Sequence, residues 1–181
     1  MPAVPAALNP EGEEMTTLIV GIDPGLSGAL ALLGPSGLHA LHDMPVMAKG
    51  KGAGRVKNEV NGAALSHLLR EWVDGHADEV LVVVERVSSM PGQGVAGVFS
   101  LGDTIGCIRG VVAARGYPVQ FVTPQAWKKH FGLTAGKDVD GKELARAKAI
   151  QLFPEADLAR KKDHNRAEAI LIARHGWEVF R

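Results

Sequence analysis

Four acidic side chains are the candidates for chemistry in this sequence. Asp23 follows the apolar run 18–20 and precedes a Pro-Gly turn, and Glu85 ends the valine-rich run 80–84. Asp163 and Glu168 belong to a helix-like segment near the C-terminus. Strand ends that cannot solvate a charge rarely keep carboxylates without a partner, and the usual partner is a hard cation. Together the four acids predict a divalent-metal nuclease.

Phosphodiester hydrolysis explains why such residues would gather. A water must be made nucleophilic and a leaving alkoxide stabilised, and two cations about 3.5–4 Å apart can do both. Carboxylates supply the oxygen ligands that Mg²⁺ and Mn²⁺ prefer. On this interpretation Asp23 bridges two ions and Glu85 holds one of them from the adjacent strand. Asp163 and Glu168 supply the remaining ligands. The alternatives are structural acids at Asp23 and Glu85, and a helix N-cap at Asp163.

The C-terminal segment leaves one ligand open. Asp163 lies five residues before Glu168, which is about 140° of rotation on a regular helix. The two acids would therefore approach the same ion only if Asp163 stands at the N-cap, where the backbone is not yet helical. His164 lies four residues before Glu168 and shares its face, so it is the second candidate as a ligand or general acid-base group. Asn165 would be a weaker, neutral donor.

The elements that position these acids follow from hydrophobic patterning and turn residues. Strands are predicted at 17–23, 28–33, 38–43, 79–85 and 119–122, the first three forming an antiparallel meander. Helices are predicted at 62–74, 95–114, around Trp127, from Asp140 to Pro154, and at 163–175. This order predicts an α/β fold with a mixed five-stranded sheet and helices on both faces.

Length and composition set limits on the organisation. The 181 residues suit one domain, so we expect residues 1–15 to be a disordered extension and residues 16–181 to be the folded domain. No apolar stretch is judged long enough to cross a bilayer, and no signal peptide is recognised. A single cysteine, Cys107, leaves no internal disulfide. The expected compartment is therefore a reducing cytoplasm.

The formal net charge is zero, but the basic residues are unevenly distributed. They concentrate between residues 128 and 166 and in the Gly-rich stretch 49–57, which is interpreted as a mobile loop. Both clusters flank the acid-bearing elements, which favours phosphate contacts over ordinary solvated faces. Lys161 and Lys162, just before the last helix, are candidates for binding the scissile or an adjacent phosphate. The alternative is a solvated charge run.

These motifs together resemble the RuvC-type Holliday junction resolvases of the ribonuclease H-like superfamily, closest to their phage and chloroplast (monokaryotic chloroplast) branch. The matching segments are 21–25, Glu85 after its valine-rich strand, 93–94, 124–128 and 166–169. The resemblance implies a homodimer that cuts four-way DNA junctions symmetrically with two Mg²⁺ or Mn²⁺ ions per active site. It implies DNA contacts by Gln93, Gly94, Lys128 and Arg166, and a bacterial or phage-encoded origin.

The chain departs from the bacterial members at two places. The position of Asn165 holds an acid or a histidine in those proteins, whereas the chloroplast-like branch resembles the spacing of Asp163 and Glu168 found here. Bacterial members also carry a base-wedging aromatic soon after the second acid, and none occurs here before Phe99. The mode of base recognition is therefore open.

Three further interpretations concern the middle of the chain and the function class. Trp127 is predicted to be a core residue rather than a platform for stacked bases. Gly102, Gly106 and Gly110 repeat every four residues and fit either a helix contact across a two-fold axis or packing on the protein's own sheet. The alternative function is a catalytically silent ribonuclease H-like nucleic-acid binding or processing factor, which would not need all four acids.

Overall fold

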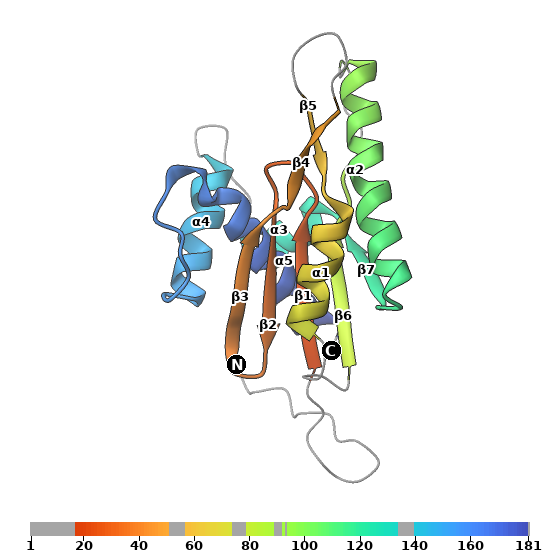
Figure 1. Cartoon of the computed structure of the whole chain (residues 1–181). Helices are drawn as coiled ribbons and strands as arrows, with labels where there is room; N and C mark the ends of the chain where they lie inside the picture. Colours follow the sequence, from red (N-terminus) through yellow and green to blue (C-terminus); the bar gives the residue numbers. More distant parts are fainter. Residues whose placement is uncertain are drawn as a thin grey trace.

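A mixed five-stranded sheet forms the centre of the protein (Figure 1). The computed structural model describes residues 17–50, 57–73, 79–88, 92, 94–133 and 140–180, so the expected extension at 1–15 lies outside it. The strand order is β3-β2-β1-β6-β7. These strands are β1 (Thr17–Asp23), β2 (Ala29–Gly34), β3 (Gly37–Asp43), β6 (Glu79–Glu85) and β7 (Val119–Val122).

The pairing of these strands confirms the predicted fold class. β1, β2 and β3 form an antiparallel meander, while β6 runs parallel to β1 and β7 runs parallel to β6. Ile22 of β1 pairs with Val84 of β6, so the carboxyl ends of these two central strands meet at one edge of the sheet. That edge carries the first two predicted site acids, Asp23 and Glu85.

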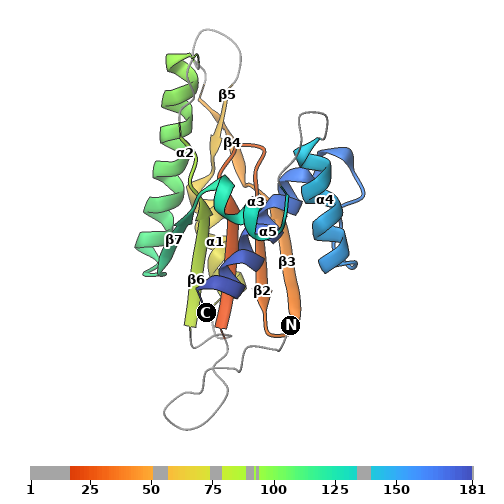
Figure 2. The same ribbon diagram turned by 180° about the vertical axis from the view of Figure 1, so that it is seen from behind.

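Helices cover both faces of the sheet (Figure 2). One face packs against α1 (Gly62–Val73) and α2 (Val95–Ala114) through the side chains of β1 and β6 that alternate toward them. The opposite face packs against α5 (His164–Val179), with α3 (Pro124–His130) and α4 (Gly141–Leu152) beside it. A short 3₁₀ turn, η1 (Lys161–Asp163), precedes α5, so the last helix begins one residue later than predicted and continues further.

Gly21 sets how closely α5 approaches the central strand. A Cβ at this position would stand 2.4 Å from the carbonyl oxygen of Ala169 and 2.4 Å from the backbone nitrogen of Ala173. Only a residue without a side chain leaves room for the helix backbone there. The close approach brings Glu168, the neighbour of Ala169, to the carboxyl end of β1.

We expect Gly21→Ala to destabilise the protein by about 3 kcal/mol, the upper end of the range for overpacked cores, because the clash is with backbone that cannot rotate away. The measurement is urea unfolding. Gly50→Ala is the matched control, since a Cβ at Gly50 meets no atom within 4 Å, and it is expected to be nearly neutral. Equal stability of the two variants would contradict the packing argument.

The segment between β3 and α1 differs from its prediction. The Gly-rich stretch 49–57, expected as a mobile loop, has its two ends in a hairpin of β4 (Val46–Lys49) and β5 (Lys57–Val60). Lys49 is not an open phosphate contact either, because its Nζ lies 3.0 Å from Asp103 and 3.3 Å from Glu59. Lys51, Arg55 and the side chain of Lys57, the rest of that basic cluster, lie outside the described residues.

Helix α2 presents an apolar outer face. A Cβ at Gly102, Gly106 or Gly110 would meet no atom of the described residues within 4 Å, so the alternative that they pack on the protein's own sheet is wrong. Val95 and Phe99 on the same helix are 87% and 72% exposed. By length and composition alone α2 is also apolar enough to cross a membrane, contrary to expectation.

Candidate active site

Three carboxylates from two strands and one helix approach each other at the carboxyl edge of the sheet. Asp23 ends β1 and Glu85 ends β6, while Glu168 reaches them from the first turns of α5. Their proximity is visible in the electrostatics, because Glu168 and Glu85 both raise the pKa of Asp23. The β1–β2 turn is held tight beside them: a Cβ on Gly28 would stand 2.1 Å from the carbonyl oxygen of Asp23.

Asp23 has the largest perturbation in the site. Burial, followed by repulsion from Glu168 and Glu85, raises its pKa from 3.8 to about 8. Lys142 and Lys128 act in the opposite direction but do not compensate. The two nearby lysines thus do not neutralise the negative charge of the carboxylates. Such an arrangement is typical of a site that binds a cation or of a carboxylate that acts as a general acid or base.

The high pKa of Asp23 predicts how stability depends on pH in EDTA. The folded chain holds this proton up to about pH 8, whereas the unfolded chain releases it near pH 4, so its contribution to stability falls as the pH rises between those values. Asp23→Asn should therefore be more stable than wild type by more than about 1 kcal/mol at pH 8, with a smaller gain at pH 5. Urea unfolding at both pH values tests this. A gain that does not change with pH would contradict it.

Glu85 is fixed by a buried tryptophan. The side chain of Trp127 is fully buried and its Nε1 donates a hydrogen bond to Oε1 of Glu85 at 2.8 Å. Burial raises the pKa of Glu85, and the Trp127 hydrogen bond partly opposes that shift. The prediction that Trp127 belongs to the core is confirmed, but no feature of the sequence indicated that its ring nitrogen orients a site carboxylate.

Two lysines approach the carboxylates from α3 and α4. Lys128 places its Nζ 3.7 Å from Glu168 and 5.0 Å from the centre of the Trp127 ring. Nζ of Lys142 lies 3.3 Å from Nε2 of His164 and its charge acts on Asp23. Lys128 was among the predicted DNA contacts and lies in the site. Lys142 was noted only within the basic cluster, because its position depends on how α4 packs against α5.

Asp163 is the predicted site acid that the structure does not place with the other three. Its side chain is 1% exposed and accepts hydrogen bonds from the backbone nitrogen of Arg160 at 2.7 Å and from Nε at 2.9 Å. Arg160 Nη2 also lies 2.7 Å away. Burial acts to raise the pKa of Asp163, but the Arg160 hydrogen bonds outweigh it and leave the pKa lowered. The side chain does not cap α5.

The remaining predicted contact residues have varied positions. Arg166 forms ion pairs with Asp43 and Asp157, and Asn165 donates a hydrogen bond to the carbonyl of Ser27. Gly94 precedes α2 and accepts from its first turn. Lys162 is exposed near the start of α5, while Gln93 and the side chain of Lys161 lie outside the described residues. Their proposed DNA contacts stay predictions.

Known proteins resemble this chain in sequence and in fold. No model of a known protein family matches the sequence. A segment is 38% identical over 93 residues to the protein named Holliday junction resolvase MOC1, chloroplastic, from Chlamydomonas reinhardtii, covering 50% of this chain and 10% of that relative. The Thermus thermophilus RuvC structure matches 90% of this chain and 96% of its own, with 16% identity and a TM-score of 0.54. The structure of T. thermophilus RuvC in complex with Holliday junction substrate matches the same shares, with 15% identity and a TM-score of 0.52.

The fold is therefore that of RuvC, a ribonuclease H-like fold, as predicted. Combined with the sequence similarity to the chloroplast protein, it confirms the resemblance to RuvC-type resolvases of the chloroplast branch. The chloroplast relative is named a Holliday junction resolvase, and T. thermophilus RuvC has been solved in complex with a Holliday junction substrate. The expected bacterial or phage origin has no support from the named relative, which is chloroplastic.

Proposed function

We propose that this protein is an endonuclease that hydrolyses phosphodiester bonds in four-way DNA junctions with divalent cations as cofactors. The observation that carries the proposal is the group of carboxylates at the ends of β1, β6 and the start of α5, in which the pKa of Asp23 is raised to about 8. The similarity to a named junction resolvase and the RuvC fold support the substrate class.

The donor set fits Mg²⁺ or Mn²⁺. All three grouped donors are carboxylates, the ligand class these hard ions prefer, and their mutual repulsion is what an added positive charge would relieve. No three acidic, histidine or cysteine side chains in the described ranges stand together as a finished metal cluster, so side-chain rotation is needed. Asp23, Glu85 and Glu168 would hold the ions, with Asp163 the proposed fourth ligand.

The chemistry divides between the ions and the chain. Bound divalent cations would polarise the phosphodiester and lower the pKa of an attacking water. Trp127 holds the Glu85 carboxylate in one orientation through its hydrogen bond, as outer partners of metal ligands do. Lys128 and Lys142 supply positive charge for the phosphates of the cut strand.

Cleavage of a synthetic four-way junction tests the proposal. With Mg²⁺ or Mn²⁺ we expect paired nicks in the junction and little cleavage of duplex, flap or RNA–DNA hybrid controls, and EDTA should stop the reaction. Equal cleavage of the hybrid would indicate a different nuclease of the same fold. Tight junction binding without cleavage under any divalent ion would favour the catalytically silent binding factor.

We further propose that two copies pair through α2 to place two such sites on one junction. The outer face of this helix combines exposed Phe99 and Val95 with glycines that leave room for a second backbone. A two-fold axis there would relate the two active sites, and symmetric cuts need a symmetric pair of sites. The family resemblance implies a dimer through this region as well.

Phe99→Glu is expected to convert the dimer to a monomer, because it buries a charge in the proposed contact. Sedimentation velocity measures the change. Ile150→Glu is the control, since Ile150 is also a partly exposed apolar residue, 40% exposed, but lies on α4. A wild-type protein that is monomeric with and without junction would remove this assembly.

A further inference from the structure

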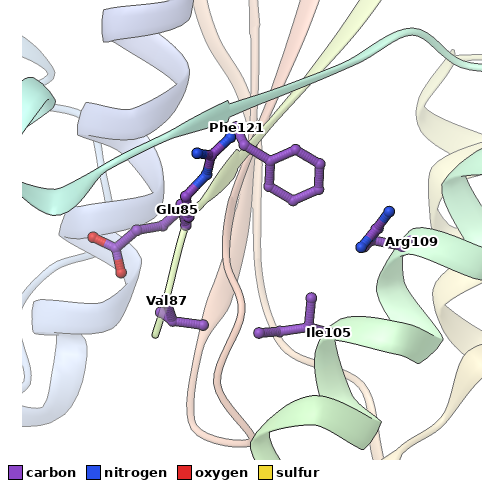
Figure 3. A pocket seen from close by; sticks show the side chains of 6 residues that line it. Glu85, Val87, Ile105, Arg109 and Phe121 are labelled. Carbon is purple, nitrogen blue, oxygen red and sulfur yellow. The ribbon is translucent and has the colours of Figure 1, made fainter. Parts of the chain in front are cut away.

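A cavity opens beside the strand end that carries Glu85, on the side that faces α2. It has a volume of about 330 Å³ and lies between the ends of β6 and β7 and the side of α2 (Figure 3). Its lining residues are Glu85, Arg86, Val87, Ile105, Arg109 and Phe121. This volume is at the small end of the range for ligand sites.

Strand alternation connects this cavity to the proposed active site. Successive side chains of a strand point to opposite faces, and Figure 3 shows the Glu85 carboxylate turned away from the ring of Phe121. Arg86 extends the β6–β7 ladder, because its backbone nitrogen donates to the carbonyl of Val122 at 2.7 Å. The side chain next to a site carboxylate is therefore an arginine held on the opposite face.

Phe121 holds two arginines in the cavity. The guanidinium carbon of Arg109, from α2, lies 5.6 Å from the centre of the Phe121 ring, and that of Arg86 lies 6.0 Å from it. Contact with an aromatic face orients a guanidinium but leaves its edge donors available. Within the described ranges neither arginine forms an ion pair. Two positive groups thus line one small cavity without an ion pair to any described acid, although Glu85 also borders the cavity.

We propose that this cavity is a second phosphate-binding site, in which Arg86 and Arg109 hold a backbone phosphate of the same DNA strand that passes the Glu85 carboxylate. The guanidinium edge matches the paired oxygens of a phosphate. The site rests on the proposed nuclease function. The phosphate site would position the DNA strand. A phosphate bound beyond the end of β6 determines which phosphodiester linkage lies against the carboxylates on the other side.

Salt-dependent binding tests the proposal. Binding of a four-way junction in EDTA is measured over a series of salt concentrations for wild type, for Arg86→Gln, for Arg109→Gln and for the double variant. The matched control is Arg70→Gln, an exposed arginine on α1 that contacts His67. The double variant should lose about one unit of the slope of log K against log salt, because the two arginines hold one phosphate, while the control keeps the wild-type slope.

A second readout locates the phosphate. Junctions carrying one neutral methylphosphonate at a time should show a linkage near the cut that weakens wild-type binding but has no further effect in the double variant, since the contact is already lost. A double variant that keeps its thermal stability, the wild-type slope and the same methylphosphonate pattern overturns the phosphate site.

The two proposals can fail separately. If wild type cleaves junctions and the arginine variants behave as the control does, the nuclease function stands and this site is rejected. If wild type cuts no junction but the double variant loses the salt slope on branched or duplex DNA, the phosphate site stands and the nuclease function is rejected.

Discussion

Asp23→Asn and Glu85→Gln are each expected to abolish junction cleavage while leaving junction binding largely intact. Each change removes a negative donor for the divalent ions but no basic contact to phosphate. Single-turnover cleavage with saturating protein measures the chemical step apart from binding. We expect a loss well beyond the roughly 10–100-fold that changes in supporting residues cost.

Trp127→Phe gives an intermediate comparison. It removes the hydrogen bond to Oε1 of Glu85 together with part of the volume of a fully buried side chain, and should cost about 10–100-fold. Asp103→Asn is the neutral control, because Asp103 is an exposed acid that forms an ion pair with Lys49. Cleavage at the wild-type rate in either Asp23→Asn or Glu85→Gln would remove these carboxylates from the chemistry. Loss of binding in step with cleavage would instead point to a disturbed fold.

The fold could be predicted because its signals are local. The runs at 17–23 and 79–85 become strands with those bounds, since an apolar run ending at turn residues has few other structures open to it. The β4–β5 hairpin was missed because its strands have only four residues each and enclose a glycine-rich stretch, so pairing across the hairpin rather than an apolar pattern defines it. The residues of one short segment do not indicate which other segment it pairs with.

The candidate site could be predicted only where it depends on the strands. That Asp23 and Glu85 share an edge follows from two parallel strands whose carboxyl ends each carry an acid. The contacts of Trp127 and Lys142 depend on how α3 and α4 pack against the sheet and α5, for which no spacing along the chain gives a rule. Arg160 was missed as the partner of Asp163 because η1 bends the chain just before α5.

The fourth acid is the place where sequence spacing and observed contacts differ most. Asp163 lies directly before α5, outside the regular helix, as its five-residue spacing to Glu168 requires of a shared metal ligand. Its oxygens, however, accept hydrogen bonds from Arg160. To bind a divalent ion, the Asp163 carboxylate would have to give up its hydrogen bonds to Arg160. Arg160 itself is 44% exposed in its side chain, so it has room to move toward solvent.

We expect Asp163→Asn to reduce cleavage as much as Glu168→Gln does, because an amide is a weaker donor than a carboxylate for Mg²⁺. Asn165→Ala should be mild, since the Asn165 amide contacts the carbonyl of Ser27 and not the grouped acids. Cleavage rates at saturating and at limiting Mg²⁺ separate loss of a ligand from loss of fold. Arg160→Gln should then lower the Mg²⁺ concentration needed for half-maximal rate, because it removes the competitor for the Asp163 oxygens.

The opposite pattern would assign Asp163 a structural role. If Asp163 only ties η1 to the start of α5, then Asp163→Asn and Arg160→Gln should lower the unfolding midpoint by similar amounts and leave the Mg²⁺ dependence unchanged, since they break the same ion pair. A severe loss in His164→Ala together with a tolerated Asp163→Asn would make His164, which already contacts Lys142 beside the acids, the residue that completes the site.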